Sequence, residues 1–527
     1  MKTKFFPVLI ASFLLVSFSC RKVQDHDDLS ISVLSEDHFE TGKTLPEATY
    51  VISGLRSNKT VTLAETSQSD SVGIFVWKYT DSSIQKWHIK PMEGNYYRIS
   101  NAYSGRVLAV SSKKQNGEPV WQKRYDGRDE ELWKIEKVSG PVYRIINKFS
   151  GLAMDLNNGQ KNGSKVVQTE IADNPGQGWQ FTRVIATYVE VEGNNFFRRT
   201  KGWIASDGCA TIPLVDGRVL WTMGDSDIDN YDSVKQQMTC LFQVRNSGLL
   251  QPSKTDWNWQ NTQTLIGNPF PGFQSYFKNK ADDDYFMWPG NGFQVEGNDT
   301  IYVYNSPLKT KGKGWEQDGN ELWAKVRSSD MKVLGYSELP DFNGINFGQG
   351  IANLNDGYIY AFGSRQTFIY SNVYVARFPV SDPDKGWTFW TKDGWSTDIK
   401  RVKPLAEAAS NGVAVCYSNN RFYIFSTEFN VGCDQGRKIY VSVGDSPTGS
   451  FTYRKEIYEI PDRLEGHSPF FYGVNAHPEF NDQRNELLIT YNINGYGDCV
   501  KTCFRGWTDP DTYRPRAVRI PFEILDK

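Results

Sequence analysis

Five segments after residue 190 share one order of apolar and polar positions. Each begins with small or polar residues, continues as an apolar strand, a turn and a second apolar strand, and ends in a polar tip. The tips recur every 60 to 80 residues, which leaves room for two more strands per unit, such as those predicted over 370–380 and 438–445. The pattern predicts five four-stranded blades of a β-propeller over 190–527. The five segments are 206–225, 289–305, 348–365, 409–428 and 475–492.

A different repeat occupies residues 47–184. Trp87, Trp133 and Trp179 recur at a spacing of 46 residues, and YRISNAYSGRVLAV (97–110) closely matches YRIINKFSGLAMDL (143–156). Three such units of short strands and turns predict a β-trefoil, with one tryptophan per unit in its core. The segment resembles the ricin-type β-trefoil lectins, whose Gln-x-Trp motif it carries twice intact and once as Glu131-Leu132-Trp133.

The lectin resemblance implies where a sugar would bind. In that family an Asp on the strand after the Ser-Gly turn holds the sugar, assisted by a polar side chain further along the repeat. The third repeat supplies this pair as Asp155 and Gln168, with Asn174 nearby, whereas Thr62 and Ala109 occupy the matching places in the other repeats. One carbohydrate-binding pocket is therefore implied. The alternative is a trefoil that has lost its sugar sites and serves as a spacer.

The N-terminus predicts export. Lys2 and Lys4 precede an apolar run that is too short for a comfortable membrane span. The run ends in Ser19-Cys20, which resembles a bacterial lipoprotein signal over residues 1–20 and implies lipidation of Cys20 on an outer-membrane protein, facing the periplasm or the cell surface. Cleavage after Ser19 without a lipid is the alternative. Residues 21–46 are predicted to be a polar tether.

Composition and charge limit the classes of partner that the protein can bind. The 59 basic and 61 acidic residues nearly balance and form no basic block, which argues against nucleic acid. Aromatic residues make up 14% of the chain, which suits an all-β protein that stacks rings against sugars. The cysteines after Cys20 are too scattered for a zinc site, but an exported chain permits disulfides, and the short loop between Cys499 and Cys503 is the easiest to close.

Acids at the ends of the predicted inner strands are the candidate catalytic groups. Asp207 opens the first inner strand and Asp225 closes the second, so a tight hairpin would bring together the two carboxyl groups that glycoside hydrolysis requires. Glu428, at the tip of the fourth unit, is the third candidate acid, with Glu407 in reserve. Residues at comparable positions are predicted to hold the substrate: His477, Arg365, Gln349, Asn291 and Trp288.

A metal is less well supported by the sequence. The aspartates spaced two apart from residue 225 resemble the start of a calcium loop, but its sixth and twelfth positions hold Asn230 and Gln236 instead of Gly and Glu. No calcium loop is therefore predicted. A structural calcium or sodium ion on the propeller axis is compatible with the sequence.

Residues 190–527 resemble the five-bladed propeller glycoside hydrolases. They are similar to the family 43 arabinanases and xylosidases, and more so to a group that includes endo-D-arabinanases, in an early Asp, a GD ending the next strand and a late AHPEF…LLITYN blade. The resemblance implies that Asp207 and Asp225 are the paired acids and that arabinose-containing polysaccharide is the substrate. Asn291 stands where family 43 has an acid. The alternatives are a non-catalytic surface glycan-binding lipoprotein and a protein-docking propeller with a flat apolar face.

Overall fold

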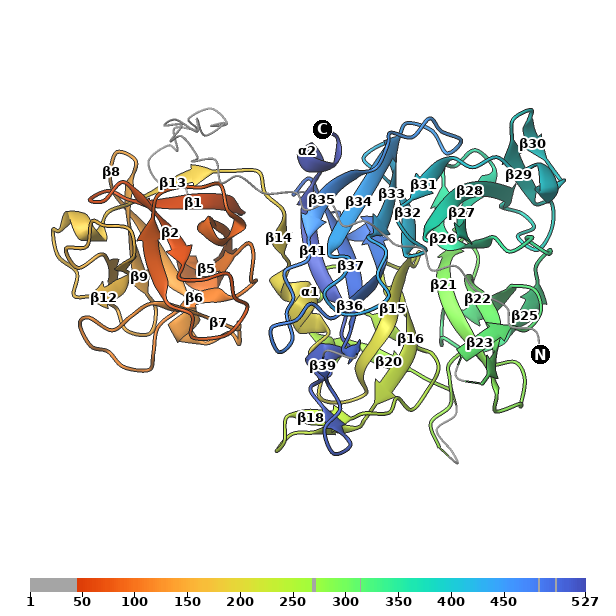
Figure 1. Ribbon diagram of the computed structural model, residues 1–527, viewed down its shortest axis with the longest axis horizontal. Helices are drawn as coiled ribbons and strands as arrows, with labels where there is room; N and C mark the ends of the chain where they lie inside the picture. The colour runs from red at the N-terminus through yellow and green to blue at the C-terminus, as the bar shows by residue number, and fades with distance from the viewer. Residues whose placement is uncertain (1–44, 268–271, 313, 482–483, 498–499) are drawn as a thin grey trace, which may run out of the picture. The chain divides into compact units, whose positions relative to one another are not determined.

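The computed structural model describes residues 45–267, 272–312, 314–481, 484–497 and 500–527. They form an N-terminal β-trefoil and a C-terminal five-bladed β-propeller, so the predicted all-β architecture is confirmed (Figure 1). Two short helices, α1 (Val191–Phe196) and α2 (Phe522–Leu525), lie at the two ends of the propeller's sequence. No helix in this part of the chain is long and apolar enough to cross a membrane. The predicted signal, Cys20 and nearly all of the tether lie outside the described residues.

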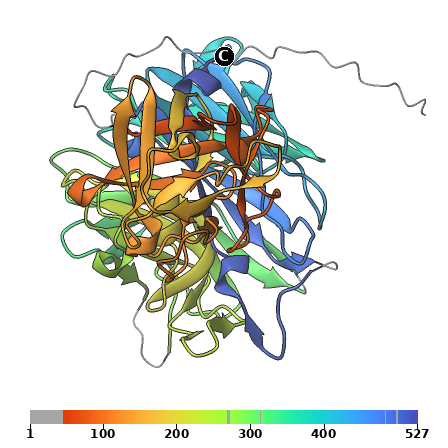
Figure 2. The ribbon, with the colours of Figure 1, turned by 90° about the vertical axis from the view of Figure 1, so that its left-hand side faces the viewer.

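The trefoil buries its three tryptophans in the same way, as predicted. Trp87, Trp133 and Trp179 have no exposed surface, and each indole N–H donates to a backbone carbonyl 25 or 26 residues earlier, at 2.8–3.0 Å. The motif therefore fills the core and also satisfies its own buried donor. Figure 2 turns this region, coloured red to orange, toward the viewer. Its strands are β1 (Ala48–Gly54), β2 (Lys59–Leu63), β3 (Ile74–Trp77), β4 (Lys86–Met92), β5 (Tyr96–Asn101), β6 (Val107–Ala109), β7 (Trp121–Lys123), β8 (Trp133–Ser139), β9 (Val142–Asn147), β10 (Ala153–Asp155), β11 (Ser164–Lys165), β12 (Val167–Thr169) and β13 (Trp179–Arg183).

The first three blades are antiparallel sheets, each built outward from a predicted inner hairpin. Blade 1 contains β15 (Trp203–Pro213), β16 (Val219–Ile228), β19 (Ser247–Gln251) and β20 (Gln263–Leu265). Blade 2 contains β21 (Tyr285–Gln294), β22 (Thr300–Lys311), β24 (Leu322–Arg327) and β25 (Val333–Glu338), and β23 (Gly314–Gln317) also pairs with β22. Blade 3 contains β26 (Asn346–Asn353), β27 (Tyr358–Thr367), β28 (Tyr370–Pro379), β29 (Thr388–Thr391) and β30 (Gly394–Ser396), and β31 (Ala406–Ala408) pairs with β28.

The last two blades close the ring. Blade 4 contains β32 (Val413–Ser418), β33 (Arg421–Thr427), β34 (Lys438–Gly444) and β35 (Lys455–Glu459). Blade 5 contains β36 (Phe470–His477), β37 (Glu486–Asn494) and β41 (Arg516–Pro521), and its outermost strand is β14 (Tyr188–Val189), from the other end of the propeller's sequence. The inner strands β15, β21, β26, β32 and β36 contact one another in a closed circle.

Close packing at the axis explains the small residues predicted on the inner strands. A Cβ added to Gly350 on β26 would lie 2.1 Å from the carbonyl oxygen of Val415, on the inner strand of the next blade. A side chain at this position would push two blades apart, so the position must be glycine for the two backbones to approach closely.

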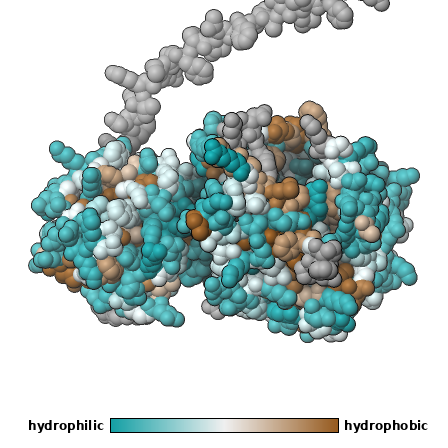
Figure 3. Space-filling view, turned by 90° about the horizontal axis from the view of Figure 1, so that it is seen from below, coloured by the Kyte–Doolittle hydropathy of each residue, from teal (hydrophilic) through white to brown (hydrophobic). Residues whose placement is uncertain are grey.

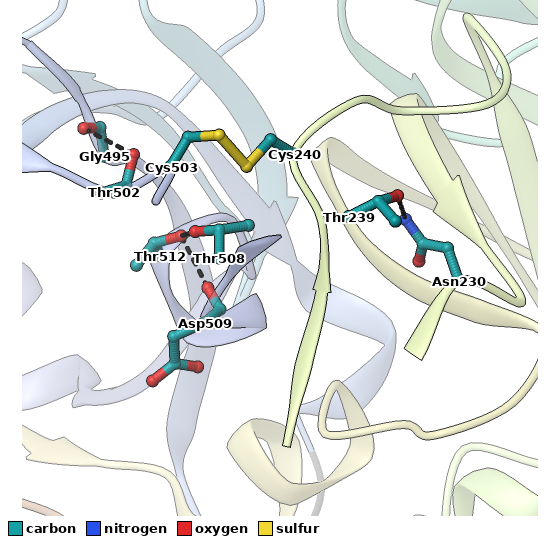
Figure 4. Close-up of a disulfide and its surroundings, with 9 residues drawn as sticks. All are labelled: Asn230, Thr239, Cys240, Gly495, Thr502, Cys503, Thr508, Asp509 and Thr512. Atoms are coloured by element: carbon teal, nitrogen blue, oxygen red, sulfur yellow. Dashed lines mark hydrogen bonds between the residues drawn. A yellow bond between two sulfur atoms is a disulfide. The ribbon is translucent and has the colours of Figure 1, made fainter. Parts of the chain in front are cut away.

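A small sheet ties the edge of blade 1 to the C-terminal part of the chain. It contains β17 (Tyr231–Asp232), β18 (Gln237–Thr239) and β40 (Trp507–Thr508), and a short hairpin of β38 (Tyr496–Gly497) and β39 (Val500–Lys501) precedes β40. Pairing of β18 with β40 places Cys240 beside Cys503, and the two form a disulfide (Figure 4). The expected bridge between Cys499 and Cys503 is therefore wrong, because strand pairing brings Cys240, which is 263 residues away in sequence, next to Cys503. Cys433 is also disulfide-bonded, whereas Cys209 and Cys416 are buried thiols.

Candidate active site

The structure brings Asp207 and Asp225 together at a β-bulge. In the inner hairpin of blade 1, Ser206 pairs with Ser226 and Gly208 pairs with Met223, so Asp207 on β15 faces two residues of β16. A bulge of this kind turns side chains away from their regular alternation. The backbone N–H of Asp225 donates to the carboxylate of Asp207, and both side chains line a cavity of about 150 Å³.

Asp207 is held by hydroxyl groups and by a glycine. The Tyr472 hydroxyl, on the inner strand of blade 5, donates to Oδ2 of Asp207 at 2.9 Å. A Cβ added to Gly224 would lie 2.2 Å from Oδ1 of Asp207, so this position must be glycine for the carboxylate to fit. Burial raises the pKa of Asp207, while hydrogen bonds from Tyr472 and Tyr513 favour its ionised form. These donors therefore oppose the effect of burial on Asp207.

Asp225 lies in a different environment. Burial and the negative charge of Asp207 raise its pKa to about 7, against the opposing effect of the nearby Arg245 guanidinium. Arg245 Nη1 lies 3.3 Å from Oδ2 of Asp225, and the Trp288 indole N–H points to Oδ1 at 3.5 Å. Asp225 therefore keeps its proton to a higher pH than an ordinary aspartate does. Two neighbouring carboxyl groups whose environments differ in this way can serve as an acid and a base.

Asp227 is a third acid in this cavity, and the sequence analysis missed it. It lies two residues after Asp225 on β16, where side chains alternate between the two faces, and it lines the same cavity with only 3% of its surface exposed. Burial raises its pKa to about 7, although the Asn230 amide donates to it at 2.7 Å. The strand period of two was the signal that pairs it with Asp225. Asp229, by contrast, is exposed and accepts the backbone N–H of Gly202.

Replacing Asp227 with asparagine is expected to stabilise the protein at alkaline pH. Because the folded carboxyl keeps its proton up to about pH 7 whereas the unfolded one loses it near pH 4, stability falls between these values as pH rises. The amide removes this penalty, worth on the order of 2–4 kcal/mol at pH 8, and can still accept the Asn230 bond. Thermal unfolding at pH 8 and pH 4 measures this. An equal gain at both pH values would contradict the argument.

Glu428 and its reserve Glu407 do not line the acidic cavity, so the predicted third acid is corrected to Asp227. Glu428 Oε2 accepts the backbone N–H of Arg437 at 2.8 Å, which closes the loop between β33 and β34. Glu407 is exposed and pairs with Arg454 at 2.8 Å. Glu428 and Asp225 both end the second strand of their units in the sequence pattern, but Glu428 is bonded to the loop that follows it.

Of the predicted substrate-holding residues, Trp288 lies at the acidic site and the others lie elsewhere. Trp288 contacts Asp225, as described. His477 has no exposed surface, lies between the hydroxyls of Thr211 and Thr490 at 2.8 and 2.9 Å, and has a pKa lowered by burial to about 3, so its predicted contact with substrate is wrong.

Three further predicted residues lie away from the acidic cavity. The Asn291 amide donates to the carbonyl of Gly348 at 3.1 Å, and its side chain lines a separate cavity with Thr211 and Glu479. Arg365 donates to the Tyr374 hydroxyl at 3.1 Å, and Gln349 is half-buried on β26. Neither Arg365 nor Gln349 lines the cavity of the acids. The acidic cavity therefore does not gather all of the predicted substrate-holding side chains.

Asp155 and Gln168, the predicted sugar-binding pair of the trefoil, form hydrogen bonds within the trefoil itself. Asp155 is 2% exposed, and its Oδ2 accepts bonds from Thr169, Asn174 and Gln177 at 2.6, 3.2 and 3.2 Å. Gln168 has no exposed surface, accepts a bond from Ser150 and donates to the carbonyl of Lys113. Both ends of its amide are bonded inside the trefoil, so Gln168 has a structural role in the third repeat, and its sugar contact stays a prediction.

No group of three or more His, Cys, Asp or Glu side chains is placed to hold a metal ion within the described ranges. The axial calcium or sodium ion stays a prediction. The groups around the three aspartates of the acidic cavity are Tyr472, Tyr513, Arg245 and Trp288.

These features define a β-propeller with an acid-lined site, preceded by a lectin-like trefoil. The chain belongs to the family described as Domain of unknown function (DUF5005), whose model matches residues 191–522. The model of the ricin-type β-trefoil lectin domain-like family matches residues 36–123 and 125–196. No curated protein matches the chain.

Several solved structures are similar to parts of the chain. A "putative hydrolase" from Bacteroides ovatus matches 63% of this chain and 89% of its own at 20% identity and a TM-score of 0.52, which shows a shared fold. A ricin B-like lectin from Macrolepiota procera, solved with lactose, matches 27% of this chain and 99% of its own at 18% identity and a TM-score of 0.24. An exo-β-1,3-galactanase from Clostridium thermocellum matches 27% of this chain and 31% of its own at 24% identity and a TM-score of 0.26.

Proposed function

We propose that the propeller is a glycoside hydrolase that cleaves a polysaccharide, with Asp207 and Asp225 as its two acids. The observation that carries the proposal is their meeting at one cavity in unlike environments. Asp225, with a pKa of about 7, donates its proton to the oxygen of the leaving sugar. Asp207, bonded by Tyr472, acts as the base or nucleophile at the sugar carbon.

The other parts of the chain fit an enzyme that works on glycans. The lectin-like trefoil would keep the polymer near the propeller, for which a weak affinity is enough. The description of the Bacteroides ovatus neighbour as a hydrolase agrees with the proposal at a coarse level. Arabinose-containing polysaccharide is the favoured substrate on family resemblance. The N-terminal segment ending in Ser19-Cys20 supports export and lipid anchoring at the outer membrane.

Incubation with a panel of arabinan, arabinogalactan, galactan and xylan tests the proposal. Wild type is expected to release sugar from at least one of them, and the Asp207→Asn and Asp225→Asn variants are not. Release that survives both substitutions would place the hydrolytic site elsewhere. Binding without release would favour the alternative, a non-catalytic surface glycan-binding protein. The face drawn in Figure 3 is mostly hydrophilic, with apolar residues in small groups, which gives no support to a flat apolar docking face there.

The pH profile of hydrolysis is expected to fall on the alkaline side near pH 7. Asp225 must be protonated to donate, so kcat/KM should drop about tenfold per pH unit above its pKa. Replacing Arg245 with glutamine removes a positive charge that favours the ionised carboxylate, so the alkaline limb should move to higher pH. An alkaline limb that stays in place in the Arg245→Gln variant would remove Asp225 from the role of acid.

A further inference from the structure

The acidic cavity is closed on one side by a cross-linked wall. Part of its lining comes from blade 1 and the chain that follows it, between residues 207 and 242. The rest comes from the C-terminal part, namely Asn494, Gly495, Thr502, Cys503, Thr508, Thr512 and Tyr513. These two stretches are joined by the pairing of β18 with β40 and by the disulfide between Cys240 and Cys503 (Figure 4). Both cysteines line the cavity. This side of the cavity is therefore held in place by a covalent bond as well as by strand pairing.

The size of the cavity limits what it holds. At about 150 Å³ it is smaller than the roughly 300–1,000 Å³ of pockets for drug-sized ligands. One sugar ring is the unit that suits it, and several rings in a row do not. The rest of a polymer would have to extend away from the wall.

An aromatic pair lies next to Asp225 and outside the cavity lining. Trp288, on β21 of blade 2, directs its indole N–H to Oδ1 of Asp225 at 3.5 Å. Its ring meets that of Trp315, on β23, edge to face at 4.9 Å between centroids, and Trp315 is 54% exposed. Exposed tryptophan faces are suited to stack against the apolar face of a sugar ring. Asp225 thus lies at the boundary between a one-ring cavity and an aromatic surface.

We propose that the site takes the end of a glycan chain, with the terminal ring in the cavity and the next ring on Trp288 and Trp315. This inference rests on the proposed hydrolase function. It places the proton donor Asp225 beside the oxygen that joins the two rings, where a general acid must be. The bond between the carbon of the terminal ring and the bridging oxygen breaks, and the shortened chain leaves with the proton from Asp225. A water molecule supplies the hydroxyl group that this carbon gains. Its remaining proton passes to Asp207 when Asp207 is the base, or to Asp225 when Asp207 first bonds to the carbon as the nucleophile. The enzyme then shortens chains from one end and releases one sugar at a time.

Product analysis distinguishes this inference from the proposed function. With the polysaccharide of the panel that wild type degrades fastest, we expect monosaccharide from the earliest times and little loss of viscosity. A ladder of oligosaccharides with a rapid loss of viscosity would show internal cleavage and overturn the inference while leaving the hydrolase function standing. No release from any polysaccharide would overturn the proposed function and the inference with it.

The Trp315→Ala variant tests the second ring position. KM for the polysaccharide should rise roughly tenfold, with kcat within about twofold, while KM for an aryl glycoside of a single ring stays unchanged. Phe368→Ala is the matched control, because Phe368 is 90% exposed on the turn between β27 and β28 of blade 3. An unchanged KM for the polysaccharide in Trp315→Ala, or an equal rise in Phe368→Ala, would overturn the aromatic position.

Discussion

The Asp225→Asn variant is expected to lose polysaccharide hydrolysis by about 10²–10⁴-fold, the contribution typical of a general acid. The amide has the same size as the carboxyl and can accept the indole N–H of Trp288, but it has no proton to give. An aryl glycoside with a dinitrophenyl leaving group needs little protonation, so its hydrolysis should fall far less. Initial rates on both substrates measure the difference.

Asp207→Asn should lose both activities, because the base or nucleophile is needed whatever group leaves. Glu428→Gln is a matched control, since this carboxyl lies outside the cavity and accepts the backbone N–H of Arg437 in a loop. It should keep the wild-type rate. The assignment fails if Glu428→Gln abolishes hydrolysis while Asp225→Asn leaves it intact.

The Trp179→Ala variant is expected to lose about 3–5 kcal/mol of stability in the trefoil. The change empties a fully buried site and leaves the carbonyl of Met154 without its indole donor. Because a chain with two such regions need not unfold in one step, the midpoint of the first transition in urea is the quantity to compare.

Trp315→Ala serves as the control for stability, since more than half of this side chain is exposed and such changes are usually within about 0.5 kcal/mol. Equal midpoints for the two variants would mean that the repeated tryptophans do not hold the trefoil core.

The repeats made the architecture predictable. A trefoil or a propeller must bury the same kind of side chain once per unit, so the sequence repeats at the length of the unit, as at Trp87, Trp133 and Trp179. Small residues such as Gly350 repeat for a similar reason, because five inner strands crowd one axis. Local pairing of an inner hairpin also sufficed to bring Asp207 to Asp225.

The remaining site residues depended on contacts that no repeat specifies. Glu428 and His477 were predicted from their places in the repeated units. In the structure, Glu428 bonds to the backbone of Arg437 in a loop, and His477 is buried between two threonines, so neither lines the cavity. The disulfide prediction failed because it rested on the short loop between Cys499 and Cys503, which is the loop with the smallest entropy cost to close. Loop length says nothing about the strand pairing that places Cys240 beside Cys503.

Strand β14 makes blade 5 depend on both ends of the propeller's sequence. β14 is synthesised before blades 1 to 4, yet its partner β41 is made last. A chain truncated before residue 516 would therefore lack β41, so β14 would have no partner strand. Blade 5 would then expose an unpaired edge, a state prone to aggregation. Losing a few C-terminal residues should consequently harm production of the protein far more than their number implies.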